Sequence, residues 1–206
     1  PTAPSSARGR CRRLASLGAA LFPYRQITPA PLEHPPRPLL NRYCDDGHMK
    51  IEMAFEIECT PDAAWNALHL PRVVAELYEP LMRMPGSDRL PERWFDGESG
   101  EVELRFAGLL PAGRQVIKIR DESHGEGPSL TRSMHDIGHA TSGPLALLQG
   151  WHHRMTIRPS PKVPVHALWS ERVEFHGPVA PLAWPLMRVI WQWRVRRIRE
   201  MATNWR

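Results

Sequence analysis

Two ionisable side chains stand among apolar neighbours in the C-terminal half of the chain, at spacings typical of β-strands. His153 alternates with residues that are otherwise apolar, namely Trp151, Met155 and Ile157. Glu171 alternates in the same way with Ala167, Trp169, Val173 and Phe175. Because alternate residues of a strand share one face, both side chains are expected to point into the protein. The two segments follow one another along the chain, so His153 and Glu171 could meet there.

A histidine and a carboxylate that meet inside a protein suit three roles. An ionised carboxylate on an apolar face is costly unless it is paired or hydrated, so Glu171 needs a partner. The pair could anchor the hydroxyl or carbonyl group of a ligand, or it could act as the acid and base of a cyclase or dehydratase. It could also be purely structural, as a satisfied hydrogen bond in the core or a pair at a sheet end that is open to water.

Other candidate centres are weaker. His135 and His139 have the spacing that places two metal ligands on one helical face, but Gly138 and the strand-like pattern around them predict a β-strand. His152 and His153 are adjacent in a strand and therefore point to opposite faces. The sequence contains no glycine-rich phosphate loop and no Gly-x-Ser-x-Gly motif. We predict neither a metal site nor a cofactor.

The C-terminal segment from about residue 181 to 205 shows apolar residues every three or four positions, with a skip at Arg194. This period predicts one long amphipathic helix. The segment also contains three tryptophans and five arginines, namely Trp184, Trp191, Trp193, Arg188, Arg194, Arg196, Arg197 and Arg199. Tryptophan and arginine together are typical of helices that lie on anionic membranes, so transient membrane contact is one hypothesis. The alternative is an ordinary charged outer face on a helix that packs on a sheet.

Length and charge limit the remaining possibilities. The 206 residues carry a formal net charge of +5, but residues 1–48 contribute +4 and residues 179–206 contribute +5, which leaves −4 for residues 49–178. The positive charge therefore lies at the two ends of the chain and residues 49–178 are mildly acidic, so a nucleic-acid partner is not predicted. No run of about 18 apolar residues spans a bilayer. Three cysteines at no metal-like spacing favour a reduced, cytoplasmic setting, with Cys59 as a small buried residue.

Residues 1–48 differ in composition and periodicity from the rest. They contain eight of the 22 prolines and no sustained period, which predicts a flexible leader in front of a domain at residues 49–206. Arg8–Arg13 followed by Leu14–Phe22 resembles the order of a secretory signal but has no clean cleavage site. Met49 opens the first patterned segment, so translation from Met49 is an alternative.

Within residues 49–206 the pattern predicts an α+β domain. Lys50–Cys59 alternates as a strand, and two short helices are expected after Thr60-Pro61 and after Pro71. Six further strands are expected before the long terminal helix, at Arg89–Phe95, Glu101–Phe106, Gln115–Arg120, Leu130–His139, Trp151–Arg158 and His166–His176. The expected fold is an antiparallel curved sheet of about seven strands wrapped around a long C-terminal helix.

This order resembles the helix-grip fold of the SRPBCC superfamily, which includes START lipid-transfer domains, birch-pollen-allergen-like proteins and polyketide cyclases. The resemblance rests on the opening Phe55-Glu-Ile-Glu-Cys-Thr-Pro-Asp-Ala-Ala-Trp65, on Gly150-Trp151-His-His153, and on the run Trp169 to Pro178 before the long helix. It implies a cavity between sheet and helix that holds a hydrophobic small molecule or lipid, and pockets of this kind measure roughly 300 to 1,000 Å³.

The sequence therefore favours a non-catalytic binding protein over an enzyme or a peripheral membrane protein. We expect this binding protein to be a monomer or a homodimer. Its expected ligand-binding residues are His153, Glu171, Trp151, Trp169, Trp65, Met155, Trp191 and Met187. If the protein is an enzyme, His153 and Glu171 are the expected catalytic pair.

Overall fold

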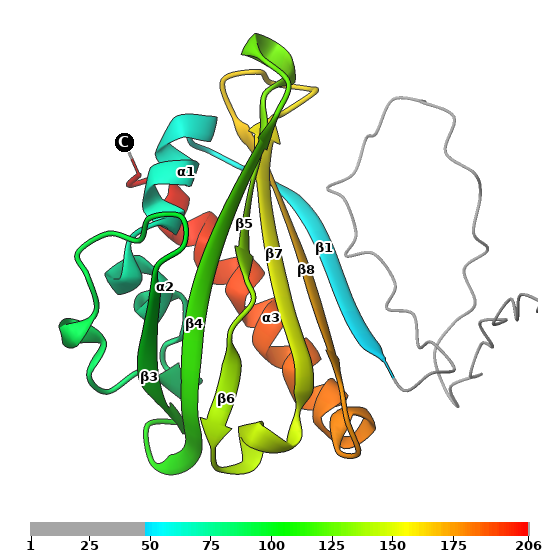
Figure 1. The fold of residues 1–206 in the computed structure, drawn as a ribbon. Helices are drawn as coiled ribbons and strands as arrows, with labels where there is room; N and C mark the ends of the chain where they lie inside the picture. The colour runs from blue at the N-terminus through cyan, green and yellow to red at the C-terminus, as the bar shows by residue number, and fades with distance from the viewer. Residues whose placement is uncertain (1–47, 206) are drawn as a thin grey trace, which may run out of the picture.

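The computed structural model describes residues 48–205, and these form one curled sheet closed by helices (Figure 1). The predicted leader lies, apart from His48, outside the described residues. Every strand pairing in the sheet is antiparallel, in the order β1-β8-β7-β5-β4-β3-β2, with β6 paired to β4. The strands are β1 (Met49–Ile57), β2 (Met82–Arg83), β3 (Ser99–Phe106), β4 (Leu110–His124), β5 (Thr131–Asp136), β6 (His139–Ser142), β7 (Gln149–Pro159) and β8 (Ala167–His176).

Three α-helices cover the concave face of this sheet. They are α1 (Pro61–Leu68), α2 (Pro71–Tyr78) and α3 (Ala180–Ala202). The Thr60 side chain accepts a hydrogen bond from the Ala63 amide at 3.1 Å, and Pro61 and Pro71 begin their helices, as the sequence predicted. The long α3 runs across the hollow of the sheet (Figure 1), which confirms the predicted helix-grip fold. None of the helices in this part of the chain is long and apolar enough to cross a membrane.

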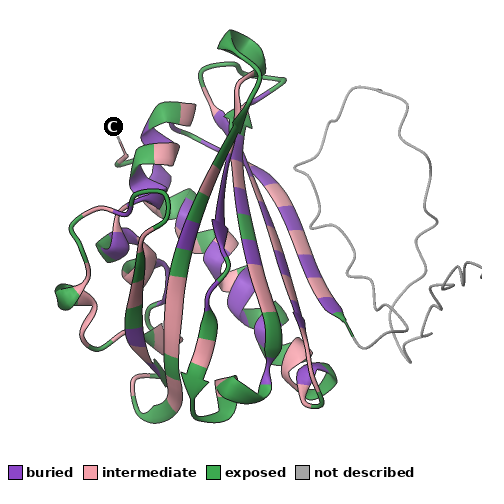
Figure 2. Cartoon of the chain, viewed as in Figure 1, coloured by how far each residue is buried: buried purple, intermediate pink, exposed green. Residues whose placement is uncertain are grey.

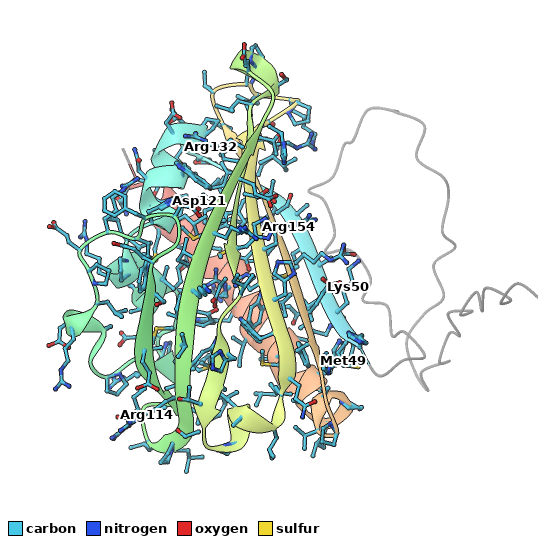
Figure 3. All side chains as sticks on the ribbon, viewed as in Figure 1. Met49, Lys50, Arg114, Asp121, Arg132 and Arg154 are labelled. Carbon is cyan, nitrogen blue, oxygen red and sulfur yellow. The ribbon has the colours of Figure 1, made fainter. Side chains whose placement is uncertain are left out.

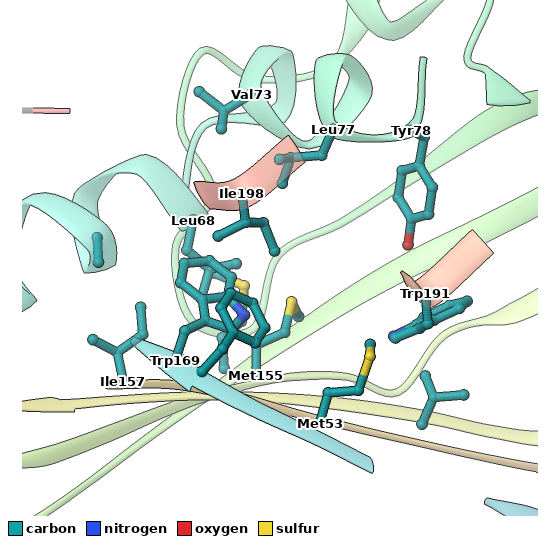
Figure 4. Packing of buried hydrophobic residues seen from close by; sticks show 14 of the residues in the cluster. Met53, Leu68, Val73, Leu77, Tyr78, Met155, Ile157, Trp169, Trp191 and Ile198 are labelled. Carbon is teal, nitrogen blue, oxygen red and sulfur yellow. The ribbon is translucent and has the colours of Figure 1, made fainter. Parts of the chain in front are cut away.

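Burial follows the predicted alternation most closely in β1 and β8. Every second residue of each strand is buried, from Met49 to Ile57 and from Ala167 to Phe175 (Figure 2). These faces pack with α1, α2 and α3 into the core, where Trp169, Ile157 and Ile198 lie close together (Figure 4). The core therefore sits between the sheet and α3, where a cavity was expected.

Two strand predictions were wrong. Arg89–Phe95 is not a strand, because residues 87–89 form a short 3-10 helix and the segment beyond them is irregular, with the Trp94 side chain buried. Leu130–His139 is not one strand, because the chain bends at residues 137–138 between β5 and β6. A Cβ atom on Gly138 would lie 1.7 Å from the Val116 carbonyl oxygen, so this bend needs glycine.

Candidate functional site

A partly open cavity of about 90 Å³ lies between α3 and the sheet. Its wall is mainly apolar, and five methionines from three strands, the segment after β2 and α3 contribute to it: Met82, Met84, Met134, Met155 and Met187. Three tryptophans, Trp94, Trp151 and Trp191, also line it. Methionine has an unbranched, flexible side chain that fills irregular space and yields to a different neighbour. The wall is therefore both apolar and deformable.

The cavity is smaller than the resemblance implied. A molecule of liquid water occupies about 30 Å³, so a volume of about 90 Å³ corresponds to only a few waters. The large indole rings and the methionine side chains take up the space that the backbone leaves between sheet and helix. A ligand larger than a few atoms has to displace some of these side chains.

Five of the eight predicted ligand-binding residues line this cavity. They are Trp151, His153 and Met155 from β7 and Met187 and Trp191 from α3. The alternation in β7 orients the first three, because His153 and Met155 are buried while Arg154 between them is exposed. Figure 3 labels Arg154, whose exposed side chain lies on the outer face of β7. The period of α3 orients Met187 and Trp191, which are four residues apart on its buried face.

The other three predicted residues, Glu171, Trp169 and Trp65, do not line the cavity. Glu171 is buried behind Arg194, and the Trp169 indole donates a hydrogen bond from Nε1 to Glu171 Oε1 at 3.0 Å. Trp65 packs against the ring of His69, with 4.4 Å between the ring centroids, and the Arg132 guanidinium lies 5.3 Å from its ring centroid.

His153 and Glu171 meet inside the protein, as the strand pattern suggested. His153 Nε2 lies 3.5 Å from Glu171 Oε2, although the arrangement lacks the geometry of a hydrogen bond. The stronger partner of Glu171 is Arg194 of α3, whose Nε donates to Oε2 at 3.2 Å and whose Nη2 donates to Oε1 at 2.7 Å. The carboxylate is therefore paired, as its burial requires.

This pairing decides what Glu171 can do chemically. Burial alone would raise the pKa of Glu171, but the Arg194 guanidinium, together with His153, holds that pKa well below its ordinary value. A carboxylate with such a low pKa has no proton to donate at neutral pH and is a weak base. The geometry of Glu171 therefore favours a structural or ligand-positioning role over acid–base catalysis.

Three further side chains line the cavity that the sequence analysis did not predict as site residues. Arg194 lines the cavity and is 1% exposed, with its Cζ 4.6 Å from the centroid of the Tyr78 ring. Burial raises the pKa of Tyr78 to about 12, so its hydroxyl stays protonated at neutral pH. The sequence could have indicated that Arg194 is buried, because it lies three residues after Trp191 and four before Ile198. This spacing places it on the apolar face of the helix.

Asp136 is the third missed residue. Its Oδ1 accepts hydrogen bonds from the amides of Lys118 and Gly138 at 3.1 and 3.0 Å, and its Oδ2 accepts one from Trp151 Nε1 at 3.2 Å. Burial raises the pKa of Asp136, while the two backbone amides oppose that effect. The residue lies opposite His153 in the β5–β7 register and lines the cavity.

The histidines that raised the metal question lie apart. His139 is exposed in β6, whereas His135 is buried in β5 with its Nδ1 2.9 Å from His152 Nε2. Among residues 48–205, no three His, Cys, Asp or Glu side chains come together in a way that could hold a metal ion.

The terminal helix places its tryptophans in different environments. Trp193 donates a hydrogen bond from Nε1 to the Glu79 carbonyl oxygen at 3.0 Å. This bond joins α3 to the residue that follows α2. The exposed side of α3 nevertheless contains Leu182, Leu186 and Val189, which are 84%, 46% and 54% exposed.

Comparisons with known proteins show the fold and no closer relationship. The sequence matches no protein-family model and no curated protein. A protein from Arthrobacter aurescens, solved by NMR, is 11% identical with a TM-score of 0.56, over 82% of this chain and 93% of that one. A hypothetical protein from Helicobacter pylori is 12% identical with a TM-score of 0.50, over 76% and 88% of the two chains. At such identities the similarity shows a shared fold alone.

A third solved structure, truncated norcoclaurine synthase from Thalictrum flavum, is 13% identical over 75% of this chain and 92% of that one. Its TM-score of 0.48 is too low to carry an argument about this protein.

Proposed function

We propose that this protein binds a small hydrophobic molecule in the cavity between its sheet and α3. The observation that carries the proposal is the composition of the cavity wall, which is largely apolar. Its polar side chains include Asp136, His153 and Arg194, which lie near one another and are called the polar end below. Such a site takes up lipophilic molecules by removing their surface from water, at about 25 cal/mol for each Å² of apolar area buried. The few polar groups then orient the molecule.

The methionine side chains supply the additional space that a ligand requires. Met82 and Met84 lie at and beside β2, a strand that pairs with β3 through only two residues. Both side chains are partly exposed, so this part of the wall borders solvent. Few backbone hydrogen bonds hold it in place, which makes it the part of the wall most easily displaced.

Two measurements test this function. Protein purified from its native host is extracted with organic solvent and the extract is examined by mass spectrometry, and the emptied protein is titrated with an apolar fluorescent dye. We expect a co-purifying hydrophobic molecule and saturable dye binding at one site. An empty extract together with no dye binding would refute the proposal.

A pair of alanine substitutions shows whether the dye occupies this cavity. Ala140 of β6 lines the cavity, whereas Ala146 is exposed and does not. Ala140→Leu adds three carbon atoms to the wall and is expected to weaken dye binding at least tenfold. Ala146→Leu makes the same chemical change outside and should leave the affinity unchanged. Equal affinities in both variants would place the dye elsewhere.

A different feature favours a second function, docking on an anionic membrane. Leu182, Leu186 and Val189 recur at four and three residues on the exposed side of α3, next to the exposed Arg188. Apolar side chains of this kind can enter the acyl region of a bilayer while arginine contacts anionic headgroups. A carrier of apolar molecules could use such a surface to reach a membrane.

Flotation with liposomes tests the membrane function independently of the cavity. The protein is expected to float with vesicles that contain phosphatidylglycerol, and less with pure phosphatidylcholine vesicles or at high salt. The double substitution Leu182→Ser and Leu186→Ser should abolish flotation without affecting dye binding. Flotation that ignores lipid charge, salt and these substitutions would exclude this function.

A further inference from the structure

Three buried nitrogen atoms at the polar end of the cavity make no hydrogen bond of good geometry among the described residues, although Glu171 Oε2 lies 3.5 Å from one of them, His153 Nε2. They are Arg194 Nη1, Trp191 Nε1 and His153 Nε2, and all three residues line the cavity. The three residues are 1%, 1% and 4% exposed, so bulk water does not reach them freely. Leaving a buried donor unpaired destabilises a protein, so three such nitrogens at one site are unusual. Together they indicate a binding partner for the cavity.

The three side chains are close to one another. The ring centroids of His153 and Trp191 are 5.2 Å apart, and Arg194 Cζ lies 5.9 Å from the Trp191 ring centroid. Figure 4 shows Trp191 with Tyr78 nearby, and their ring centroids are 6.3 Å apart. A single small group in the cavity can therefore approach more than one of these nitrogens.

The chemistry of these atoms defines the group that they would bind. Arginine Nη1 and tryptophan Nε1 are hydrogen-bond donors in every state, whereas His153 Nε2 donates or accepts according to its tautomer. The two buried carboxylates nearby are already occupied, Glu171 by Arg194 and Trp169, and Asp136 by two backbone amides and Trp151. The free hydrogen-bonding capacity at this end is therefore for an acceptor.

Charge decides which acceptor fits best. The positive charge of Arg194 is already balanced by Glu171, and Asp136 contributes a further carboxyl group at the same end. A ligand carboxylate would add a negative charge to a site that has no uncompensated positive charge from Arg194. A neutral oxygen accepts the same hydrogen bonds without that cost.

We infer that the ligand presents a carbonyl oxygen to Arg194, Trp191 and His153. The inference rests on the proposed function, because it needs an apolar molecule in the cavity. The apolar body of the ligand lies among the methionines, and its carbonyl oxygen takes the place of the acceptor that the three nitrogens lack. The site would then select carbonyl compounds over hydrocarbons of the same shape.

Two probes of nearly the same shape test this selection. Acetophenone has a C=O group where α-methylstyrene has C=CH₂, and benzoate supplies a carboxylate of similar size. The ratio of the dissociation constants of α-methylstyrene and acetophenone is measured for the wild type and for two variants. Trp191→Phe removes one of the three nitrogens, and Trp94→Phe makes the same change elsewhere on the cavity wall.

We expect Trp191→Phe to lower this ratio by about 3- to 10-fold, and Trp94→Phe to leave it unchanged. Benzoate should bind the wild type more weakly than acetophenone does. In the ¹H–¹⁵N spectrum of the wild type, acetophenone should shift the Trp191 indole resonance more than α-methylstyrene does. This last measurement does not depend on the stability of any variant.

The outcomes separate the two proposals. If both probes and the dye fail to bind, the proposed function and this inference fail together. If the probes bind but the ratio is the same in Trp191→Phe and the Trp191 resonance is unmoved by acetophenone, the proposed function stands and the inference is overturned. Tighter binding of benzoate than of acetophenone would also overturn it.

Discussion

Arg194 of α3 and Glu171 of β8 form a two-point ion pair in the interior, with donor–acceptor distances of 3.2 and 2.7 Å. The Glu171 side chain is 0% exposed and that of Arg194 is 1% exposed. The pair joins the terminal helix to the sheet, while Nη1 of the same guanidinium has no hydrogen-bond partner among the described residues and Arg194 itself lines the cavity. One contact therefore links the packing of α3 to the polar end of the candidate site.

Removing the charge of Glu171 should destabilise the fold strongly. Glu171→Gln leaves the Arg194 guanidinium buried without its counter-charge, which typically costs about 3–5 kcal/mol. Urea unfolding followed by tryptophan fluorescence measures the loss. The control is Glu174→Gln on the partly exposed outer face of β8, where the bond to Arg172 is worth at most about 1 kcal/mol. Similar losses in both variants would contradict the assignment of Glu171 as the buried anchor.

Replacing both members of the pair should be far less damaging than replacing one. The double substitution Glu171→Leu and Arg194→Met leaves no uncompensated charge and fills the space with apolar atoms, a change that is often neutral or stabilising. We expect the double variant to be more stable than Glu171→Gln by at least about 2 kcal/mol. The same unfolding experiment measures it. A double variant that is no better than the single one would mean that Arg194 is not the main partner.

The ion pair also predicts how stability depends on pH. The pKa of Glu171 is lower in the folded protein than in the unfolded chain, so its contribution is fully present above the unfolded value of about 4.3 and is lost as pH falls below it. Glu171→Gln should therefore lose less stability than the wild type between pH 5 and 3. Asp136 acts in the opposite direction, because its pKa is raised, but both proteins contain it. Parallel pH profiles would exclude this explanation.

The buried thiol of Cys59 provides a test of the packing between β1 and α1. Burial raises the pKa of Cys59 to about 11, so at pH 8 the thiolate is about a hundredfold rarer than for an ordinary cysteine. In a variant with Cys11→Ser and Cys44→Ser, we expect Ellman's reagent to react with Cys59 only as fast as the protein unfolds. The same variant in urea is the positive control. Rapid reaction in native buffer would show that this end of β1 opens.

The sequence predicted the orientation of the strand residues well because alternation is a local property. His153 and Glu171 follow from the period of two in β7 and β8, and this period is kept wherever one face of a strand is buried. The two short helices were predicted for a similar reason, since Thr60, Pro61 and Pro71 act on the first turn that follows them.

The composition of the cavity wall was harder to predict because it depends on contacts between distant segments. Trp65 and Trp169 have the same alternation or helical spacing as true wall residues, yet Trp65 packs against His69 and Trp169 bonds to Glu171. Arg194 interrupted an apolar face, as Glu171 did, but only the three-dimensional structure shows that the two interruptions meet. Burying either charge alone is unfavourable, and pairing Glu171 with Arg194 offsets that penalty.

Gly138 should be indispensable for the bend between β5 and β6 and for the position of Asp136. A Cβ atom there would meet the Val116 carbonyl at 1.7 Å, and the Gly138 amide donates to Asp136 Oδ1 at 3.0 Å. Because the clash is with backbone, Gly138→Ala is expected to cost about 3 kcal/mol, as overpacking of a rigid site does.

The matched control is Gly127→Ala. Its φ of +53° strains an alanine, but nothing lies within 4 Å of the added atom. That strain alone costs about 1–2 kcal/mol, so unfolding experiments should find Gly138→Ala the more damaging of the two. Gly138→Ala should also weaken dye binding, because it moves Asp136 and with it the hydrogen bond to Trp151 on the cavity wall. A Gly138→Ala protein with wild-type stability and dye affinity would show that β5 and β6 tolerate another path, and that Asp136 does not depend on this bend.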